Sequence, residues 1–504
     1  MDVIHNIFLG LSIIFEPINL LYCFIGVFIG TLIGVLPGIG PTATISLLLP
    51  VTFKATPVSA VILLAGIYYG AQYGGSTTSI LVNIPGEAAS VVTCLDGYQM
   101  ARKGRAGPAL GISAFGSFIG GTLSVVGLMI IAPPLASISL KFGPPEYFSL
   151  MCLGLTILVY LASGSIIRAF MVAAFGIIIG CVGQDPGTGS PRFVFGMTAL
   201  LDGIGLAPLV MGLFGISEVF LNIEQSLAKR DIFETKIKKL FPNFQDWKDS
   251  IKPILRGSFI GFFLGILPGG GAVISSFTSY AVEKKFSKHP EKFGTGAIEG
   301  VAGPETANNA ATGGAFIPLL TLGIPPNVVM ALLLGALMIH GVAPGPLLIE
   351  RNPQMFWGII ASMYLGNAML LVLNLPLIGI WVQVLKVPYK ILFPLILFFC
   401  LIGAYSINNS TFDVGLMLLF GVLGYLMRKY NYEGAPLILA YVLGPMFESS
   451  LRQSLLISKG SFSIFFTRPI ACGAMILTLI MLSSSLLPAI KKRREVISME
   501  EKMS

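Results

Sequence analysis

The sequence has little charge: Asp, Glu, Lys and Arg make up only 11% of its 504 residues, against about 25% in soluble domains. The mean hydropathy is +0.84. Several charge-free stretches exceed the roughly 20 residues that cross a bilayer. They include Pro17–Phe53, Ala55–Gly86, Gly107–Leu140 and Asn352–Leu385. The composition excludes an ordinary soluble domain. It predicts an all-α polytopic membrane protein with about 12 transmembrane helices.

The signatures of several enzyme classes are also missing. No GxxxxGK[ST] phosphate loop, HExxH zinc motif or GxSxG nucleophile elbow occurs. The three histidines are dispersed, and the six cysteines are scattered without a CxxC pair, which is typical of reduced thiols packed in helices. The sequence therefore predicts neither an enzyme, nor a bound cofactor, nor a resident metal ion.

Basic residues concentrate in short loops and at the C-terminus, so the net charge of +8 is not a nucleic-acid signal. By the positive-inside rule, the basic segments Arg102–Arg105 and Lys284–Lys292 and the tail Lys491–Ser504 are expected in the cytoplasm. No Lys or Arg precedes Lys54. Because a secretory signal needs a basic n-region, we expect the first apolar segment to be retained.

One fifteen-residue element occurs twice. "GVFIGTLIGVLPGIG" (Gly26–Gly40) and "GSFIGFFLGILPGGG" (Gly257–Gly271) share nine of their fifteen positions. A second correspondence follows each copy: a small and polar run, a Gly-Gly pair and then Ile-Pro, with Ile84 and Ile324 lying 240 positions apart. Two motifs in the same order and at similar spacing indicate an internal duplication.

The duplication suggests the domain organisation. The charged segment 222–256 reads as a linker with a short amphipathic helix at the membrane surface. It separates a first membrane repeat (1–221) from a second (257–490), which the basic tail (491–504) follows. The two halves are basic on opposite loops. That pattern predicts inverted repeats, which place substrate and ion sites at the midplane between them.

The Pro-Gly breakers of the repeated element predict broken or re-entrant helices. Proline removes a donor and glycine permits unusual backbone angles, so each breaker should end a helix inside the membrane. The freed N–H groups and helix N-terminus would then face an anion. The alternatives are a kinked helix or a tight surface turn. The breaker residues in the predicted site are Pro37, Gly38, Gly40, Pro268, Gly269 and Gly271.

Hydroxyl and amide side chains cluster beside the breakers. Such groups can donate to carboxylates or give oxygen ligands to Na⁺ without carrying a charge into the membrane. The alternative is that they join helices, as Ser, Thr and Gly do in bilayers. The predicted substrate and ion site includes Thr42, Ser76, Thr77, Thr78, Ser79, Asn83, Ser275, Thr306, Asn308, Asn309 and Thr312, with transient Na⁺ at Asn308 and Asn309.

Few ionisable residues interrupt the apolar stretches. Glu87, Glu299 and Glu305 are candidates for function because intramembrane acids are rare, but each lies near a Pro or Gly and could instead cap a helix. Arg168 is interpreted as an arginine at the membrane boundary, whose charged end reaches the interface. His340 reads as structural.

Three segments resemble the large membrane subunit of the tripartite tricarboxylate transporter family: "GVLPGIGPTATISLLLP", "YYGAQYGGSTTSILVNIPGEAASVVTCLDGYQMARKGRAGPALG" and "EGVAGPETANNAATGGAFIPLLTLGIP". The resemblance runs from about Gly26 into the mid-300s. It implies a bacterial inner-membrane permease that works with a small four-helix membrane subunit and a periplasmic solute-binding protein. It also implies uptake of citrate or another carboxylate, driven by a cation gradient that is typically Na⁺.

Together, residues and resemblance predict a secondary carboxylate transporter built from two inverted repeats, with a cytoplasmic C-terminus. The alternative from another class is an anion channel or passive membrane scaffold without ion coupling. An intramembrane hydrolase would need a nucleophile–base or aspartate pair that the sequence does not offer. The residues do not distinguish one carboxylate from another.

Overall fold

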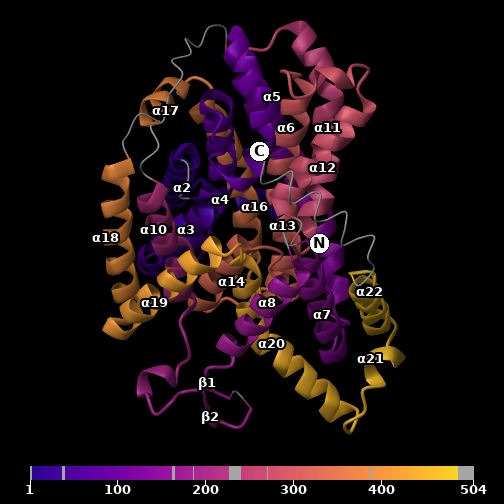
Figure 1. The fold of residues 1–504 in the computed structure, drawn as a ribbon. Helices are drawn as coiled ribbons and strands as arrows, with labels where there is room; N and C mark the ends of the chain where they lie inside the picture. The colour runs from indigo at the N-terminus through magenta and orange to yellow at the C-terminus, as the bar shows by residue number, and fades with distance from the viewer. Residues whose placement is uncertain are drawn as a thin grey trace.

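The computed structural model describes residues 3–36, 40–161, 165–185, 187–225, 240–269, 271–385 and 389–485. Most of these residues are helical, which confirms the predicted all-α class (Figure 1). Within the described ranges, the strands are β1 (Gly183–Gln184) and β2 (Pro191–Arg192), which pair antiparallel.

The helices follow one another with short connections. The α-helices before the charged segment are α1 (Val3–Ile14), α2 (Pro17–Val35), α3 (Gly40–Leu48), α4 (Pro57–Val82), α5 (Val91–Met100), α6 (Ala106–Ser139), α7 (Pro144–Leu161), α8 (Ile166–Gly180), α9 (Leu206–Val210) and α10 (Ser217–Gln225). Shorter 3-10 or π turns are η1 (Leu49–Lys54), η2 (Ala88–Ser90), η3 (Ala101–Arg105), η4 (Thr198–Leu200) and η5 (Met211–Ile216).

The remaining helices are α11 (Phe244–Ile266), α12 (Gly271–Phe286), α13 (Glu299–Leu322), α14 (Val328–Ile339), α15 (Leu348–Arg351), α16 (Pro353–Asn374), α17 (Ile378–Val384), α18 (Tyr389–Asn408), α19 (Thr411–Lys429), α20 (Ala435–Ile457), α21 (Ile464–Thr467) and α22 (Pro469–Ser485), with the 3-10 turn η6 (Pro290–Lys292). Helix α11 begins inside the segment expected as a linker, where Asn243 and Asp246 form a capping box. Residues 226–239 and the basic tail lie outside the described residues.

Several helices are long and apolar enough to cross a membrane. In the described part of the chain there are four such segments: Pro17–Val35, Ala88–Ser139, Pro353–Asn374 and Thr411–Lys429. Six shorter apolar helices accompany them. Large apolar side chains such as Ile130, Ile167 and Leu419 are exposed, as lipid contact requires. The chain is therefore a multi-pass membrane protein, and the number of about 12 spans stays a prediction.

The repeated glycines bring two helix pairs into close contact. Gly26, Gly30 and Gly34 of α2 lie against the backbone of α4, where an added Cβ would come under 3.0 Å from the carbonyl oxygens of Leu63, Ile67 and Ala71. Small residues allow membrane helices to approach this closely. Helix α4 is consequently buried along most of its length.

The second copy of the element packs in the same way. Gly257, Gly261 and Gly265 of α11 lie against α13, where an added Cβ would come under 3.0 Å from the carbonyl oxygens of Gly303, Ala307 and Ala311. The three contacted carbonyls lie 240 positions beyond their counterparts in α4. The duplicated sequence therefore produces duplicated packing, and it places both polar helices in the interior.

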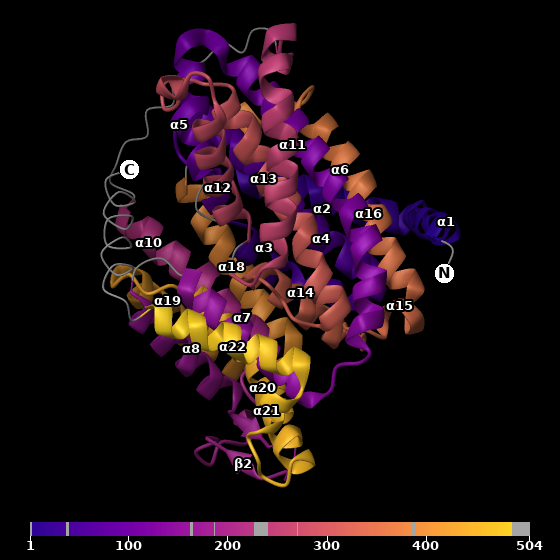
Figure 2. The same ribbon diagram turned by 90° about the vertical axis from the view of Figure 1, so that its right-hand side faces the viewer.

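The two predicted cytoplasmic loops lie together at one end of the molecule. The buried Asp96 of α5 accepts hydrogen bonds from the N–H groups of Gly294 (2.9 Å), Gly296 (2.7 Å) and Ala297 (2.8 Å). Lys103 Nζ donates to the Thr295 carbonyl at 2.5 Å. Both views place this end opposite the β1–β2 pair (Figures 1 and 2). The two basic segments thus lie at the same end of the molecule.

Candidate functional site

The polar runs of α4 and α13 face the protein interior. Helix α4 begins at Pro57, because Thr56 Oγ1 accepts from the Ser59 N–H at 3.2 Å and proline suits the first helical position. Residues Ser76, Thr77, Thr78 and Ser79 of α4 are all buried. The same is true of Thr306, Asn308, Asn309 and Thr312 of α13. The structure therefore brings both predicted clusters into the core.

The two breakers separate consecutive helices. The second lies between α11 and α12 and includes Gly269, whose φ is 76° and whose N–H donates to the Pro326 carbonyl at 2.9 Å. That N–H is therefore paired within the protein. Pro268 is half-buried beside it. The first breaker lies between α2 and α3, and its residues Pro37 and Gly38 fall outside the described residues.

The helices that follow the breakers start alike. Gly40 and Gly271 both have positive φ values, 63° and 46°, which favour glycine. One turn later, Thr44 Oγ1 donates to the Gly40 carbonyl at 2.9 Å and Ser275 Oγ donates to the Gly271 carbonyl at 2.7 Å. Thr42 is half-buried, and its carbonyl accepts from Ser46 Oγ at 2.7 Å. These hydroxyls bond to their own helices.

A fully buried carboxylate lies where α13 meets α4 and α5. Glu305 of α13 has no exposed surface. Ser76 Oγ of α4 donates to its Oε2, and Thr93 Oγ1 of α5 donates to its Oε1. Hydroxyl groups can both donate and accept, so this arrangement can hold the carboxyl in either protonation state.

A second carboxylate lies nearby, at the turn between α4 and α5. Glu87 caps η2, where its Oε2 accepts from the Ala89 N–H at 2.9 Å. Asn308 Nδ2 of α13 donates to Glu87 Oε1 at 3.2 Å. The Gln72 amide of α4 also points at this carboxylate, and with its nitrogen turned toward Glu87 it donates to Oε1 at 2.8 Å and to Oε2 at 3.2 Å. Three elements thus converge on one half-buried acid.

A contact in the second repeat corresponds to the one at Glu87. Asn327 follows the second Ile-Pro element and caps α14, where its Oδ1 accepts from the Met330 N–H at 2.9 Å. Its Nδ2 donates to the Tyr68 hydroxyl of α4 at 3.2 Å. Asn327 lies 240 positions after Glu87, and Asn308 lies 240 positions after Tyr68. Each polar helix therefore contacts the capping residue of the other half.

The other predicted residues mostly bond within or between helices. Thr78 Oγ1 donates to the Val35 carbonyl at 2.7 Å, and Ser79 Oγ donates to Ser90 Oγ at 2.9 Å. Thr306 Oγ1 donates to the Ala302 carbonyl at 2.7 Å, and Thr312 Oγ1 donates to the Asn309 carbonyl at 2.6 Å. Asn309 Nδ2 donates to Ser117 Oγ at 2.7 Å. Asn309 Oδ1 is buried without a hydrogen-bond partner. Asn83 is exposed and ends α4 in the left-handed conformation.

Sequence reasoning left out residues that are central to this arrangement. No sequence pattern marks Gln72, Tyr68 or Thr93 as functional, because each lies in ordinary helical sequence. Glu87 and Glu305 carry the one usable signal, an acidic residue in or beside a charge-free stretch. Glu299, the third such acid, lies in the first turn of α13, where an acid complements the helix dipole.

Arg168 and His340 lie away from this cluster. Arg168 Nη1 donates to the Tyr430 carbonyl at 3.1 Å, and its guanidinium lies over the Tyr432 ring at 5.3 Å from the centroid. His340 ends α14. Neither contacts Glu87 or Glu305 in the hydrogen bonds and ion pairs of the described residues.

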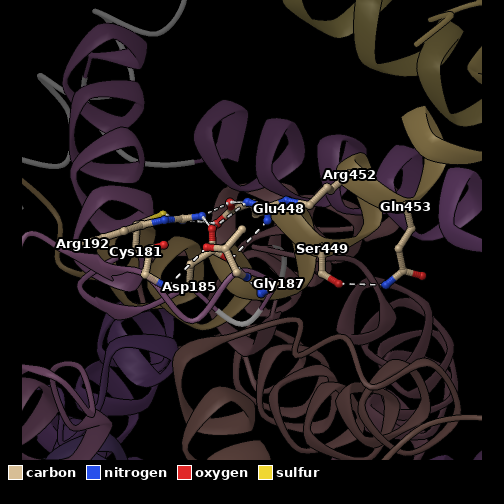
Figure 3. A network of polar contacts seen from close by, with 10 residues as sticks. Cys181, Asp185, Gly187, Arg192, Glu448, Ser449, Arg452 and Gln453 are labelled. Atoms are coloured by element: carbon tan, nitrogen blue, oxygen red, sulfur yellow. Dashed lines mark hydrogen bonds and ion pairs between the residues drawn. The ribbon is translucent and has the colours of Figure 1, made fainter. Parts of the chain in front are cut away.

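A separate charged network joins the loop after α8 to α20 (Figure 3). Arg452 donates to both oxygens of Asp185 at 3.1 Å and to Glu448 Oε1 at 2.6 Å. Arg192 of β2 donates to Glu448 at 2.8 and 2.9 Å and also pairs with Asp185. The Arg452 guanidinium, helped by the Gly187 N–H and by Arg192, lowers the pKa of Asp185 below its usual range. The network fastens this loop to α20.

Comparison with known proteins identifies relatives along almost the whole chain. The family model described as "Tripartite tricarboxylate transporter TctA family" matches residues 20–439. The "Uncharacterized 52.8 kDa protein in TAR-I ttuC' 3'region" of Agrobacterium vitis is 51% identical over 501 residues, which cover 99% of this chain and all of that protein. The "Uncharacterized protein in TAR-II ttuC' 3'region" of the same organism is 53% identical over 241 residues, 48% of this chain and all of that protein. No solved structure matches.

Proposed function

We propose, from the premise that the chain belongs to the tripartite tricarboxylate transporter TctA family, that it is a secondary active permease importing citrate or a related carboxylate. It is a transport protein and not an enzyme. Import would be coupled to a cation gradient, with Na⁺ as the coupling ion. No tightly bound cofactor is needed for such a mechanism.

One observation carries the proposal: two carboxylates lie among neutral donors where α4, α5 and α13 meet. Glu305 accepts from hydroxyls, and Glu87 accepts from amide and backbone N–H groups. Within the described ranges, no ion pair joins either acid to a basic side chain. An uncompensated charge at the bilayer centre costs about 2.5–3.5 kcal/mol. Such a cost is tolerated where the group binds a transported ion.

The repeat geometry supports two inverted halves. The glycine contacts of α2 with α4 recur between α11 and α13. The pairs Glu87–Asn308 and Asn327–Tyr68 are related by the same spacing of 240 positions. Helix α5 lies near the end of the molecule opposite β1 and β2, whereas its counterpart α14 lies nearer to that strand pair (Figures 1 and 2). Inverted repeats place their transported ligands at the interface between the halves.

The proposed site lies between the two polar helices. Ser76 and Asn308 would belong to it through their contacts with the acids. The described residues of the two breakers, Gly40, Pro268, Gly269 and Gly271, would border it. Substrate would bind among the neutral hydroxyl and amide donors, because these can donate to a carboxylate without the desolvation cost of a buried basic residue. Alternating access would move one bundle against the other around this site.

The family also suggests partners and location. We propose that the chain acts in the bacterial inner membrane with a small four-helix membrane subunit. A periplasmic solute-binding protein would deliver the substrate. The shared end of the loops at Lys103 and Thr295 would then face the cytoplasm, as the positive-inside rule requires.

The test is uptake of radiolabelled citrate by proteoliposomes that contain this chain and its small subunit, with the binding protein outside. Accumulation only with an inward Na⁺ gradient is expected. Accumulation of a different carboxylate under the same gradient would keep the mechanism and change the substrate. Flux that only equilibrates, whatever the ion, would instead support the channel or scaffold alternative.

A further inference from the structure

The donors around Glu87 suit its ionised form. The Ala89 N–H and the Asn308 amide group can only donate, and both point at the carboxylate oxygens, at 2.9 and 3.2 Å. An ionised carboxylate accepts from both donors and keeps lone pairs for a further ligand. The hydroxyls around Glu305 show no such preference, since they can accept as well. Glu87 is therefore the acid whose hydrogen-bond donors are suited to a negative charge.

The Gln72 amide can turn either its nitrogen or its oxygen toward Glu87. Gln72 is only 3% exposed. One terminal atom of its amide lies within 3.2 Å of both Glu87 oxygens and 2.5 Å from Asn308 Oδ1. If this atom is the nitrogen, it donates to the carboxylate. If it is the oxygen, four oxygen atoms converge, and either a cation between them or a proton on Glu87 makes that arrangement favourable.

The charge and the ligands of this group fit a monovalent cation. One carboxylate neutralises one positive charge, and hard cations prefer carboxylate and amide oxygens. A divalent ion would leave a net charge inside the membrane unless Glu305 were also ionised. Glu87 is half-buried, whereas Gln72 and Asn308 are buried, so the ion would enter from the Glu87 side.

We propose that Glu87, Gln72 and Asn308 form the binding site for the coupling Na⁺, and that the Gln72 amide turns its oxygen inward when the ion binds. This inference rests on the proposed function for the role of the ion in transport. The site joins α4 of the first repeat to α13 of the second through η2. Binding therefore ties the two halves together, which is what coupling of an ion to alternating access requires.

The corresponding place in the second repeat explains why one site is expected and not two. There the capping residue is Asn327, and its partner is the Tyr68 hydroxyl. An amide and a phenol carry no formal charge to balance a cation. The duplication thus retained the geometry, while the negative charge is present in one copy only.

The experiment measures Na⁺ binding directly and without substrate. The full chain, purified in detergent with its small subunit, is titrated with NaCl against choline chloride at constant ionic strength. Binding is followed by displacement of ²²Na⁺ and by the shift in melting temperature, since a ligand of the folded state stabilises it. Wild type should bind Na⁺ and be stabilised by it, whereas choline should have no effect.

Two variants and a matched control assign the ligands. Glu87→Gln removes the charge and should weaken Na⁺ binding at least about tenfold. Gln72→Met removes the amide at similar size and should weaken it less. The control Glu291→Gln makes the same chemical change on an exposed turn and should bind as wild type does. If Glu87→Gln does not fold, Gln72→Met alone carries the test.

The possible outcomes separate this inference from the proposed function. Unchanged Na⁺ binding in Gln72→Met and Glu87→Gln overturns the site. Absence of any Na⁺ effect in wild type, with stabilisation by protons alone, overturns it as well. Na⁺ binding that depends on Glu87 in a protein that transports no carboxylate would uphold the site and refute the proposed function. Na⁺-driven uptake that both substitutions leave unchanged would support the proposed function and refute the site.

Discussion

Replacing Gly261 with alanine tests the close contact between α11 and α13. The new Cβ would lie 2.7 Å from Ala307 Cα and 2.8 Å from its carbonyl carbon. These are backbone atoms, so neither can rotate away. Opening the first distance to an ordinary 3.4 Å contact already requires the helices to separate by about 0.7 Å, and the Ala307 carbonyl oxygen, which would lie closer still, requires more. A gap of this size forfeits at least a quarter to a half of the dispersion energy of each contact on that face.

Overpacking of this kind costs about 1–3 kcal/mol, whereas alanine in place of glycine favours an isolated helix by about 1 kcal/mol. The control Gly415→Ala in α19 shares the second effect only, because nothing lies within 4 Å of its added Cβ. The free energy of unfolding should therefore be lower in Gly261→Ala than in Gly415→Ala by about 1–3 kcal/mol, a factor of about 5 to 150 in the folded-to-unfolded ratio.

The assay is equilibrium unfolding in mixed micelles, followed by the fluorescence of the three tryptophans, one of which is Trp247 on α11 itself. The corresponding substitution in the first repeat, Gly30→Ala, should behave like Gly261→Ala, because its Cβ would lie 2.9 Å from both Gly70 Cα and Ile67 Cα. Equal unfolding midpoints for Gly261→Ala and Gly415→Ala would refute the packing argument.

Three further predictions concern the polar contacts. Gly75→Ala would place a Cβ 2.7 Å from Glu87 Cγ, so it should raise the Na⁺ concentration for half-maximal uptake in proteoliposomes while leaving the amount of inserted protein unchanged; normal Na⁺ dependence would contradict the crowding of Glu87. Thr93→Val removes a hydroxyl donor from Glu305 and should destabilise the protein by about 1–3 kcal/mol in the micelle unfolding assay, whereas Thr93→Ser should not; equal losses would indicate a packing effect. Because the folded state lowers the pKa of Asp185, the stability it contributes should be present at neutral pH and lost as the pH falls below about 4, and melting curves from pH 7 to pH 3 should show a smaller acid-induced drop for Asp185→Asn than for wild type.

Much of the architecture followed from the repeated element. The sequence motif predicted a helix break at Pro268–Gly271, and the structure ends α11 at Ile266 and begins α12 at Gly271. The glycine spacing in α2 and α11 was visible as part of the repeat, but its packing partners were not. A stripe of small residues shows that something approaches closely, without showing which helix does so.

The contacts at the candidate site could not be predicted from the sequence, and the reason is physical. Thr93 and Glu305 are 212 positions apart, and Asn308 and Glu87 are 221 apart. A long-range contact leaves no periodic signal in a single sequence, so Gln72 and Thr93 looked like ordinary helical residues. Thr306 and Thr312 were predicted as ligands because they are polar. In the structure both hydroxyls donate to their own helix, a common way to bury a hydroxyl in a membrane, and their role as ligands stays a prediction.

Under the proposed function, the difference between the two capping residues would connect the repeat to ion coupling. A duplicated fold with identical side chains would offer the same ligand set twice, and the two halves would then bind the same kind of ion. Here one half has Glu87 and the other has Asn327 in the same structural role, each contacted from the opposite polar helix. The negative cap suits a cation, while the neutral cap leaves the N-terminus of α14 free of negative charge. This combination of a shared backbone and unequal charge would suit the proposed transport of an anion together with a cation.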